Sequence, residues 1–420
     1  MSEIESLTVL ARLDDPAFYA NDPHAVFKRL RREAPVFWIE PTGFWAVTSY
    51  EAVHTAFTDP ERFSSLGDQQ LVAWTQDREH FMRFSEDAEF PPPTARNLIT
   101  SDAPFHTVFR KMVMKTGQFG AKAVPAIEER LSPFVDDLGR NLAAGATGEA
   151  DEIVSAPLAA ATIACFLGLP LEFAGSLRRW SEAIEPPGSG DTPQRMQAGA
   201  EAASEMWTVL RDLLDADSHH GTLCLLRDQQ KLTDEVDTDD LLELVCDLVV
   251  AGVESTRNMV TSGLVAFAQH PDEWTRIQSG EVSVDNAVEE ILRWEPPAPT
   301  IGRVATEDTT LAGQPINAGD RLLLMYASAN RDESVWTDPD RFDVTRSSKV
   351  PNLAFGRGAH LCVGASFSRM SMRMIIETLL SNNVRFNLTA PPKRAPGVNA
   401  TAQYATAPMS FERDNSAQHN

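Results

Sequence analysis

The stretch that most constrains the fold of this chain is 355–364, which reads Phe-Gly-Arg-Gly-Ala-His-Leu-Cys-Val-Gly. Its three glycines exclude an ordinary helix interior or a strand, because glycine readily adopts positive φ angles and lets the backbone approach a flat ligand closely. The sequence predicts a helix directly afterwards, over 365–380. Cys362 therefore lies near the N-terminus of that helix, where the helix dipole favours its thiolate form.

A single thiolate in a glycine-rich loop suits some metals better than others. Structural zinc sites use four protein ligands, whereas Cys165, Cys224, Cys246 and Cys362 are far apart and form no Cys-x-x-Cys pair. This spacing argues against a disulfide scaffold or a structural zinc site, and it is typical of a reducing cytosol. The loop is instead well suited to supply the one protein ligand of a haem iron. The sequence has no Cys-x-x-Cys-His motif, so covalently attached haem is not expected.

Length and charge set further bounds. The chain has 420 residues, of which 43% are hydrophobic, and this is enough for two or three domains or for one large helical domain. A net charge of −23 makes nucleic acid a poor partner. The acidic N-terminus shows no apolar signal region or membrane span, which predicts a cytoplasmic protein. We expect an N-terminal extension over 1–14, a single domain over 15–413 and a disordered tail over 414–420.

Helical periodicity recurs along most of the chain. The predicted helices cover 23–34, 49–57, most of 106–280 with a break at 185–193, and 365–380. Short strands are predicted at 36–39, 43–47 and 321–327. Two long irregular stretches, 62–103 and 330–353, are predicted to be functional loops or connections.

A helix of nearly thirty residues is predicted over 241–269, long enough to cross the whole molecule. Its segment 251–256, Ala-Gly-Val-Glu-Ser-Thr, combines a glycine with an acid and two hydroxyls, which predicts a local opening of the helix. Glu254 would then be a buried acid able to relay protons, and the Ser255 hydroxyl would bond to the freed carbonyl of Ala251. The alternative is a surface acid and two hydroxyls at a helix kink.

Two further pairs stand at helical spacing. Glu290 and Arg293 are three apart and form a pair that is uninformative alone, because surface ion pairs of this kind are common. His106 and Arg110 are four apart at a predicted helix start, so both can point at one anion. The alternative for the second pair is a solvated basic face.

Together these pieces resemble one family, the cytochrome P450 monooxygenases of the soluble bacterial type, over about 15–413. The strongest element is Phe355-Gly356-x-Gly358-x-His360-x-Cys362-x-Gly364, which matches the haem-binding loop of the family at every diagnostic position. The resemblance implies a mainly α fold with small β-sheets, a long central helix over the haem and the cysteine loop beneath it. The implied cofactor is haem b, with Cys362 as the iron ligand and Phe355 beside its sulfur.

The resemblance also assigns roles to the other motifs. Ala251 would lie at the haem, and the residues implied to hold the haem propionates are His106, Arg110, Arg303 and His360. Glu290, Arg293 and Arg341 would form a buried ion-pair triad. Glu254 and Ser255 resemble the acid–alcohol pair of the family. Since the family usually has threonine where this chain has Ser255, the following Thr256 is a second candidate for the alcohol.

The implied reaction is insertion of one oxygen atom from O2 by hydroxylation or epoxidation. The chain ends soon after the predicted haem domain, so we expect electrons from a separate ferredoxin and its reductase, and we expect a monomer. A mainly apolar pocket favours a lipophilic substrate such as a terpenoid, steroid, fatty acyl or polyketide compound. Its predicted lining residues are Leu98, Ile99, Val250, Val253, Ala298, Ile301 and Tyr404. For each of them taken singly, ordinary core packing is the alternative.

Two other classes of function stay open. One is an enzyme of the same fold that catalyses oxidative coupling, dehydration or isomerisation without net oxygen insertion. The other is a non-catalytic haem-binding or ligand-binding protein. Labelled oxygen in the product would separate the first from a monooxygenase, and turnover with a surrogate ferredoxin pair would exclude the second.

Overall fold

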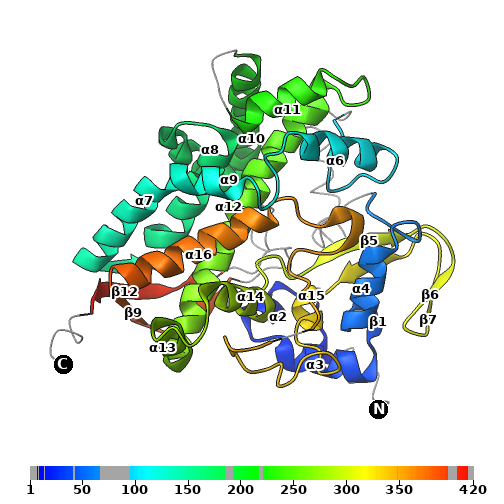
Figure 1. Cartoon of the computed structure of the whole chain (residues 1–420). Coiled ribbons are helices and arrows are strands. Elements are labelled where there is room, and N and C mark those ends of the chain that lie inside the picture. Colours follow the sequence, from blue (N-terminus) through cyan, green and yellow to red (C-terminus); the bar gives the residue numbers. More distant parts are fainter. Residues whose placement is uncertain are drawn as a thin grey trace.

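The computed structural model describes residues 7–40 except 8 and 14, and then 43–66, 95–184, 193–216, 221–347, 349–395 and 404–414. In these segments, helices make up most of the molecule and short strands form small sheets at its margins (Figure 1). The predicted mainly α fold with small β-sheets is confirmed.

The central element is the helix α12 (Thr238–Gln269), whose 32 residues run through the middle of the molecule (Figure 1). A capping box starts it: the Asp240 amide donates to the Asp237 carboxylate, and the Asp237 amide donates back to the Asp240 carboxylate. The helices α8 (Ala156–Leu167), α9 (Ala174–Ile184) and α16 (Ala365–Ser381) pack along it. Because its middle is surrounded in this way, α12 positions any side chain that it carries there with little freedom.

The predicted opening at 251–256 is wrong, because α12 stays α-helical through these residues. Gly252 serves packing instead: a Cβ at this position would collide with Cδ1 of Ile163 on α8. A π-helical turn does occur nearby at η2 (Asp151–Ser155), where the Thr261 hydroxyl of α12 donates to Ser155 over 2.8 Å. The glycine in this segment therefore reports the close approach of two helices.

The remaining helices surround this centre. Their bounds are α2 (Pro16–Ala20), α3 (His24–Glu33), α4 (Tyr50–Thr58), α6 (Phe105–Lys115), α7 (Val124–Ala144), η3 (Leu171–Phe173), α10 (Pro193–Asp215), α11 (Thr222–Gln230), α13 (Pro271–Gln278), α14 (Val284–Trp294), α15 (Tyr326–Ala329) and η4 (Gly358–His360). The predicted helices at 23–34, 49–57 and 365–380 are confirmed to within about one residue. Of the predicted break at 185–193, residues 185–192 lie outside the described residues.

The largest sheet has the strand order β1-β2-β8-β5-β3, with β2 and β8 parallel and the other neighbours antiparallel. Its strands are β1 (Val36–Ile39), β2 (Phe44–Val47), β8 (Arg321–Leu324), β5 (Ile301–Ala305) and β3 (Phe63–Ser64). The smaller sheets are β4 (Ala146–Glu149) with β12 (Pro408–Arg413) and β9 (Val384–Leu388), β6 (Thr309–Leu311) with β7 (Gln314–Ile316), and β10 (Lys393–Arg394) with β11 (Tyr404–Thr406). The strand predicted at 321–327 stops at Leu324, because α15 begins at Tyr326.

Within the N-terminal extension expected over 1–14, three of the described residues pack into the core. Leu7, Ala11 and Leu13 are buried in a cluster with Phe27 and Phe37. Residues 1–6, and residues 415–420 of the expected tail, lie outside the described residues. Among the helices of the described segments, none combines the length and apolar character needed to cross a membrane.

Candidate active site

The loop 355–364 is shaped against the end of α4. Gly356 and Gly358 have φ angles of 65° and 69°, a region that disfavours side chains. A Cβ on Gly358 would lie 2.5 Å from the carbonyl oxygen of Phe57. The Cys362 amide donates over 3.0 Å to the carbonyl at the start of the loop. Backbone geometry and close packing together therefore present Cys362.

Gly358→Ala is expected to lower the free energy of unfolding by roughly 2–4 kcal/mol, since it adds backbone strain and a collision with Phe57. The matched control is Gly313→Ala. Gly313 has a φ of 81° but nothing within 4 Å of an added Cβ, so this change should cost only the strain, about 1–2 kcal/mol. Urea unfolding of both variants measures the difference. Equal losses would show that the contact with Phe57 carries no weight.

Cys362 has an accessible side chain, although the protein around it is dense. Burial raises the pKa of the Cys362 thiol, while the amides of Gly364 and Ala365 and the guanidiniums of Arg110 and Arg369 act in the opposite direction. These donors and charges stabilise a thiolate, which is the form that binds a metal. In the segments that the structure describes, no group of three or more His, Cys, Asp or Glu side chains could hold a metal ion. The loop therefore suits a metal that needs one protein ligand.

A cluster of cationic and donor side chains lies next to this loop. The rings of His106 on α6 and His360 on η4 have centroids 3.9 Å apart. Nε2 of His106 is buried and has no partner within the described residues. Burial, together with His106, Arg303 and Arg110, lowers the pKa of His360 to about 3. Residues from three separate stretches of the sequence, α6, β5 and η4, thus bring two arginines and two imidazoles together in one place.

This cluster fits an acidic ligand. Arg303 is 2% exposed and burial lowers its pKa to about 10. Asp102, whose charge acts on Arg303 and His106, accepts hydrogen bonds from the Ser64 hydroxyl and the Ser65 amide. The buried Nε2 of His106, which has no hydrogen-bond partner within the described residues, is costly until it meets one. Two carboxylates, as in the propionates of haem, meet that requirement.

One face of α12 is open in the middle of the molecule. Ala251 is exposed and Ser255, one turn later, is half-buried, as are Asp247 one turn and Glu243 two turns before Ala251. Positions four apart share one face of a helix, so these four form a single stripe. Thr256 is 3% exposed and packs on another side. The alcohol on the open face is therefore that of Ser255.

Glu254 is a buried acid in a network of charges. Its Oε1 accepts from the Ser181 hydroxyl of α9 over 3.0 Å and lies 3.3 Å from Nη1 of Arg257. Arg257 also pairs with Asp151 over 3.1 Å and with Glu182 over 3.6 Å. Burial raises the pKa of Glu254, while Arg257 and Ser181 act against the rise. The network connects a buried carboxyl with two more exposed ones.

A buried ion pair anchors the irregular stretch that leads to the cysteine loop. Nε and Nη2 of Arg293 donate to both carboxylate oxygens of Glu290 over 2.7 and 2.8 Å, and both side chains are buried. The third member is Arg346, whose Nε donates to Glu290 over 3.1 Å. The prediction of Arg341 is wrong, because that side chain is 59% exposed and lies 3.8 Å from Glu273. Only the backbone carbonyl of Arg341 contacts the pair, as an acceptor from Arg293.

Comparison with known proteins gives the family. The cytochrome P450 family model matches residues 283–407. Linalool 8-monooxygenase of Pseudomonas putida is 31% identical to this chain, over 91% of the chain and 94% of the relative. The chain belongs to the cytochrome P450 family. Steroid C26-monooxygenase of Mycolicibacterium smegmatis is also 31% identical, over 87% of this P450 and 85% of the relative.

Solved P450 structures share the whole fold. CYP153D17 from Sphingomonas sp. PAMC 26605 superposes with a TM-score of 0.83 and 26% identity, over 96% of this chain and 99% of that one. CYP109Q5 from Chondromyces apiculatus gives a TM-score of 0.81 and 26% identity, over 96% and 98%. This P450 is therefore a haem b oxidoreductase, a monooxygenase of bacterial type.

Sequence reasoning missed two acids on the open face of α12. Burial raises the pKa of Glu243 to about 7, with a side-chain hydrogen bond from Asn97 acting against the rise. Burial and Glu243 raise the pKa of Asp247, whose Oδ2 is buried and has no partner within the described residues. The available signal was that Glu243, Asp247 and Ala251 follow one another in steps of four, which places them on one face of the helix. This P450 thus places two carboxyls on the same face as its alcohol.

Glu243→Gln is expected to stabilise the P450 increasingly as pH rises. The pKa of Glu243 is raised when folded, so folded wild type loses stability between its ordinary pKa near 4.5 and about 7. The neutral amide escapes this loss. The difference in unfolding free energy should be near zero at pH 5 and roughly 1–3 kcal/mol in favour of the variant at pH 8. Thermal unfolding of both proteins across this range measures it, and a flat difference would contradict the expectation.

The predicted pocket residues separate into two groups. Leu98 and Val253 are 6% and 0% exposed and belong to the core, so Val253 has no surface to offer a ligand and its prediction is wrong. Val250, Ala298 and Ile301 are half-buried, and Ile99 is 39% exposed. The latter four keep surface that a substrate could contact.

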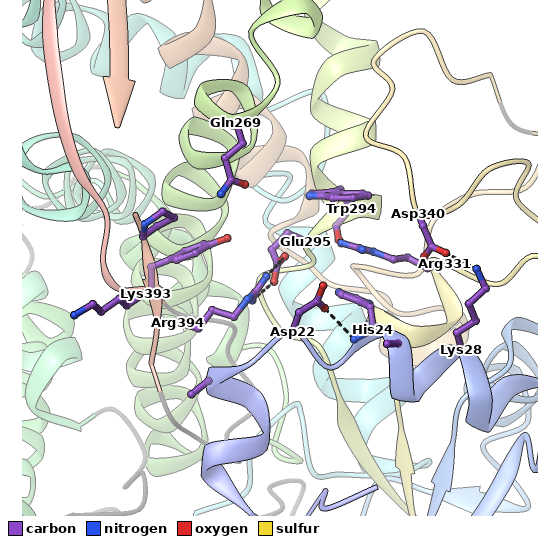
Figure 2. Close-up of a pocket in the computed structure, with 14 residues that line it drawn as sticks. Asp22, His24, Lys28, Gln269, Trp294, Glu295, Arg331, Asp340, Lys393 and Arg394 are labelled. Carbon is purple, nitrogen blue, oxygen red and sulfur yellow. Dashed lines mark hydrogen bonds and ion pairs between the residues drawn. The ribbon is translucent and has the colours of Figure 1, made fainter. Parts of the chain in front are cut away.

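The prediction that Tyr404 lines the substrate pocket is also wrong. Tyr404 lines a polar cavity. Figure 2 shows this cavity with Trp294, Glu295 and Arg394, which also line it. The guanidinium of Arg394 lies 5.2 Å from the centre of the Tyr404 ring. Neither Cys362 nor the open face of α12 lines this cavity. The position of Tyr404 follows from β11, which pairs with β10 beside the C-terminal ends of α12 and α14.

Proposed function

We propose that this P450 inserts one oxygen atom of O2 into a mainly lipophilic small molecule, by hydroxylation or epoxidation. The observation that carries the proposal is the combination of the Cys362 loop with a buried acid, Glu254, and an accessible alcohol, Ser255, on the central helix. Enzymes that only rearrange or couple substrates have less need of a proton-delivering pair. Relatives named for linalool and steroid monooxygenation support a lipophilic substrate.

The site residues divide the task of holding haem. Cys362 would bind the iron, and Gly364 and Ala365 would stabilise its negative charge through their amides. The propionates would lie against His106, Arg110, Arg303 and His360. Ala251, on α12, would also lie at the haem. When bound, haem supplies the activation of oxygen.

The acid and the alcohol would move protons. Ser255 faces the open side of α12, where its hydroxyl can hold a water molecule and pass on a proton. Glu254 is reached from the surface through the carboxyls of Asp151 and Glu182 around Arg257. Burial raises the pKa of Glu254, which favours its protonated form relative to an exposed carboxyl. The residues thus form a route from solvent to the reacting oxygen.

Ser255→Ala is expected to lower the yield of product per electron pair by about tenfold and to raise hydrogen peroxide release, because the proton donor on the open face is lost. Thr256→Ala is the matched control, since Thr256 is buried away from that face. Product and peroxide are measured together at saturating substrate. If Thr256→Ala lost coupling while Ser255→Ala coupled normally, the assignment of the proton donor to Ser255 would be wrong.

The substrate would combine an apolar body with a hydrogen-bond donor. Val250, Ala298 and Ile301 present apolar surface, whereas Glu243 and Asp247 present carboxyls on the same helix face as Ser255. A hydroxyl or amine of the substrate would satisfy the unpaired Oδ2 of Asp247. The pocket would thereby orient the substrate in addition to covering its apolar surface.

Electrons would come from a separate acidic ferredoxin. Cys362 also borders a hollow of about 290 Å³ that is lined by Arg110, Arg357 and Arg369. Arg369 is partly neutralised by Glu289 over 2.5 Å. The other two arginines leave a local positive charge on a protein with a net charge of −23, and this would steer an acidic partner in a salt-sensitive manner.

Reconstitution with a surrogate ferredoxin and reductase tests the function. A compound library is first screened for ligands that shift the haem from low to high spin. Hits are then turned over under labelled O2, and one labelled oxygen atom per product is expected. Products without labelled oxygen would favour coupling, dehydration or isomerisation. A protein that binds ligands but converts none would be a non-catalytic binder.

A further inference from the structure

The polar cavity that contains Tyr404 lies apart from the haem site. It has a volume of about 880 Å³ and is lined by residues of the N-terminal helices α2 and α3, the C-terminal ends of α12 and α14, and the pair β10–β11. Figure 2 shows that its side chains converge from these elements. Its volume is far larger than an inorganic ion, so it has room for a small organic molecule.

Arg331 is buried in this cavity with an unused donor. It is 5% exposed, its guanidinium lies 3.6 Å from the centre of the Trp294 ring, and Nη2 donates to the Trp294 carbonyl over 2.7 Å. Its Nε is buried and has no partner within the described residues. Burial lowers the pKa of Arg331 to about 10, while the charges of Glu295 and Asp22 act in the opposite direction. A buried donor of this kind is costly until it meets an acceptor.

His24 offers a second unused group in the same cavity. It is 9% exposed, and its Nδ1 is buried with no partner in the described part of the chain. Its amide donates to Asp22 over 3.0 Å, which orients the side chain at the start of α3. Burial and the nearby arginines, Arg331 foremost, lower the pKa of His24, so the ring is neutral. In the tautomer that protonates Nδ1, it donates one hydrogen bond to a ligand.

The charges that line the cavity leave a positive excess. Four cations, Lys28, Arg331, Lys393 and Arg394, face three carboxylates, Asp22, Glu295 and Asp340. Glu295 is held by Arg394 over 2.7 and 2.6 Å, and Asp340 by Lys28 over 2.7 Å. Of the charged groups that line the cavity, two cations, Arg331 and Lys393, then remain for a single carboxylate, Asp22. In a protein with a net charge of −23, this excess marks a place for an anion.

A purely structural role explains only part of Arg331. Its bond to the Trp294 carbonyl satisfies the end of α14, a common use of arginine at a helix C-terminus. That role leaves Nε of Arg331, Nδ1 of His24 and the volume of the cavity unexplained. All three features are satisfied together by one molecule that carries an oxyanion.

We propose that this cavity binds a small organic oxyanion, a carboxylate or a phosphate ester, whose charged end lies between Arg331, His24 and Lys393. The organic part would lie against Pro392 and the Tyr404 ring, which line the same cavity. Phosphate and carboxylate present the same acceptor oxygens to the guanidinium, so the chemistry fixes the charged group and leaves the body open.

Titration calorimetry of the holoenzyme tests the site, with inorganic phosphate, phenyl phosphate and benzoate as probes at constant ionic strength. We expect saturable binding of at least one organic probe, more tightly than inorganic phosphate. Lys393→Glu, at an exposed position that tolerates the change, and Arg331→Gln should each weaken it by about tenfold or more. Lys122→Glu, an exposed lysine outside the cavity, is the control and should bind as wild type.

Each result of these binding titrations either supports or overturns the proposed anion site. A preference for phenyl phosphate over benzoate, or the reverse, identifies the anion. Binding that survives both Lys393→Glu and Arg331→Gln, or that is weakened equally by Lys122→Glu, overturns the proposal, as does the absence of binding by every probe. If Arg331→Gln fails to fold, Lys393→Glu and His24→Phe carry the test. The haem spectrum should stay unchanged on binding, so this result does not depend on the proposed oxygenation.

Discussion

Replacement of Cys362 by serine is expected to abolish product formation, with a loss on the order of a thousandfold, because a serine hydroxyl cannot supply the anionic sulfur that promotes O–O cleavage. The amides of Gly364 and Ala365, and the charges of Arg110 and Arg369, would then surround a neutral group. The spectrum of the reduced, carbon monoxide-bound protein should shift to shorter wavelength. Turnover and this spectrum together measure the change.

Cys224→Ser is the control for this substitution. Cys224 is half-buried on α11 and far from the loop in sequence, so its replacement should leave both the spectrum and turnover as in wild type. A Cys362→Ser protein that kept the thiolate-type spectrum would show that another residue binds the iron. The assignment of Cys362 would then be wrong, whatever the activity.

The second large effect concerns the buried ion pair. Arg293→Ala is expected to lower the free energy of unfolding by about 3–5 kcal/mol, because it removes the bidentate cation from the buried carboxylate of Glu290 and leaves it Arg346 and the Asp343 amide. Arg346→Ala should cost roughly 2–4 kcal/mol for the same reason, as the Arg346 side chain is only 9% exposed. Arg341→Ala should cost about 0–1 kcal/mol, since the Arg341 side chain is 59% exposed and lies 3.8 Å from Glu273.

Urea unfolding of the three holoenzyme variants measures these differences, and haem retention at low urea reports whether the cysteine loop has moved. The contrast between Arg346 and Arg341 is the informative part. If Arg341→Ala proved as costly as Arg346→Ala, the third partner of Glu290 would be the one expected from the sequence. A neutral Arg293→Ala would contradict the buried pair itself.

Features that depend on local spacing could be predicted from the sequence. The cysteine loop is one, because its glycines and Cys362 lie within ten residues and their conformations are set locally. The pair Glu290 and Arg293 is another, because three residues along a helix place two side chains together whatever the rest of the fold does. The length of α12 followed in the same way from an uninterrupted helical pattern.

Features that depend on packing between distant segments could not be predicted from the sequence. Both Arg341 and Arg346 lie within the irregular stretch 330–353, and nothing in their spacing shows which side chain turns towards Glu290. The role of Gly252 depends on Ile163, which is almost ninety residues away, so the sequence suggested an opening where the structure has a close contact. Tyr404 was misplaced because its strand pairs beside a second cavity.

The charges around Arg257 have a consequence for how activity varies with pH. Glu254, Asp151 and Glu182 all lie within 3.6 Å of this one guanidinium, and burial raises the pKa of Glu254 and of Asp151, so these two neighbouring carboxyls release their protons in shared steps. A proton consumed at the reacting oxygen can be replaced from inside the protein before the solvent resupplies it. The network therefore stores protons inside the protein. For this reason, product yield should change only gradually over a wide range of pH.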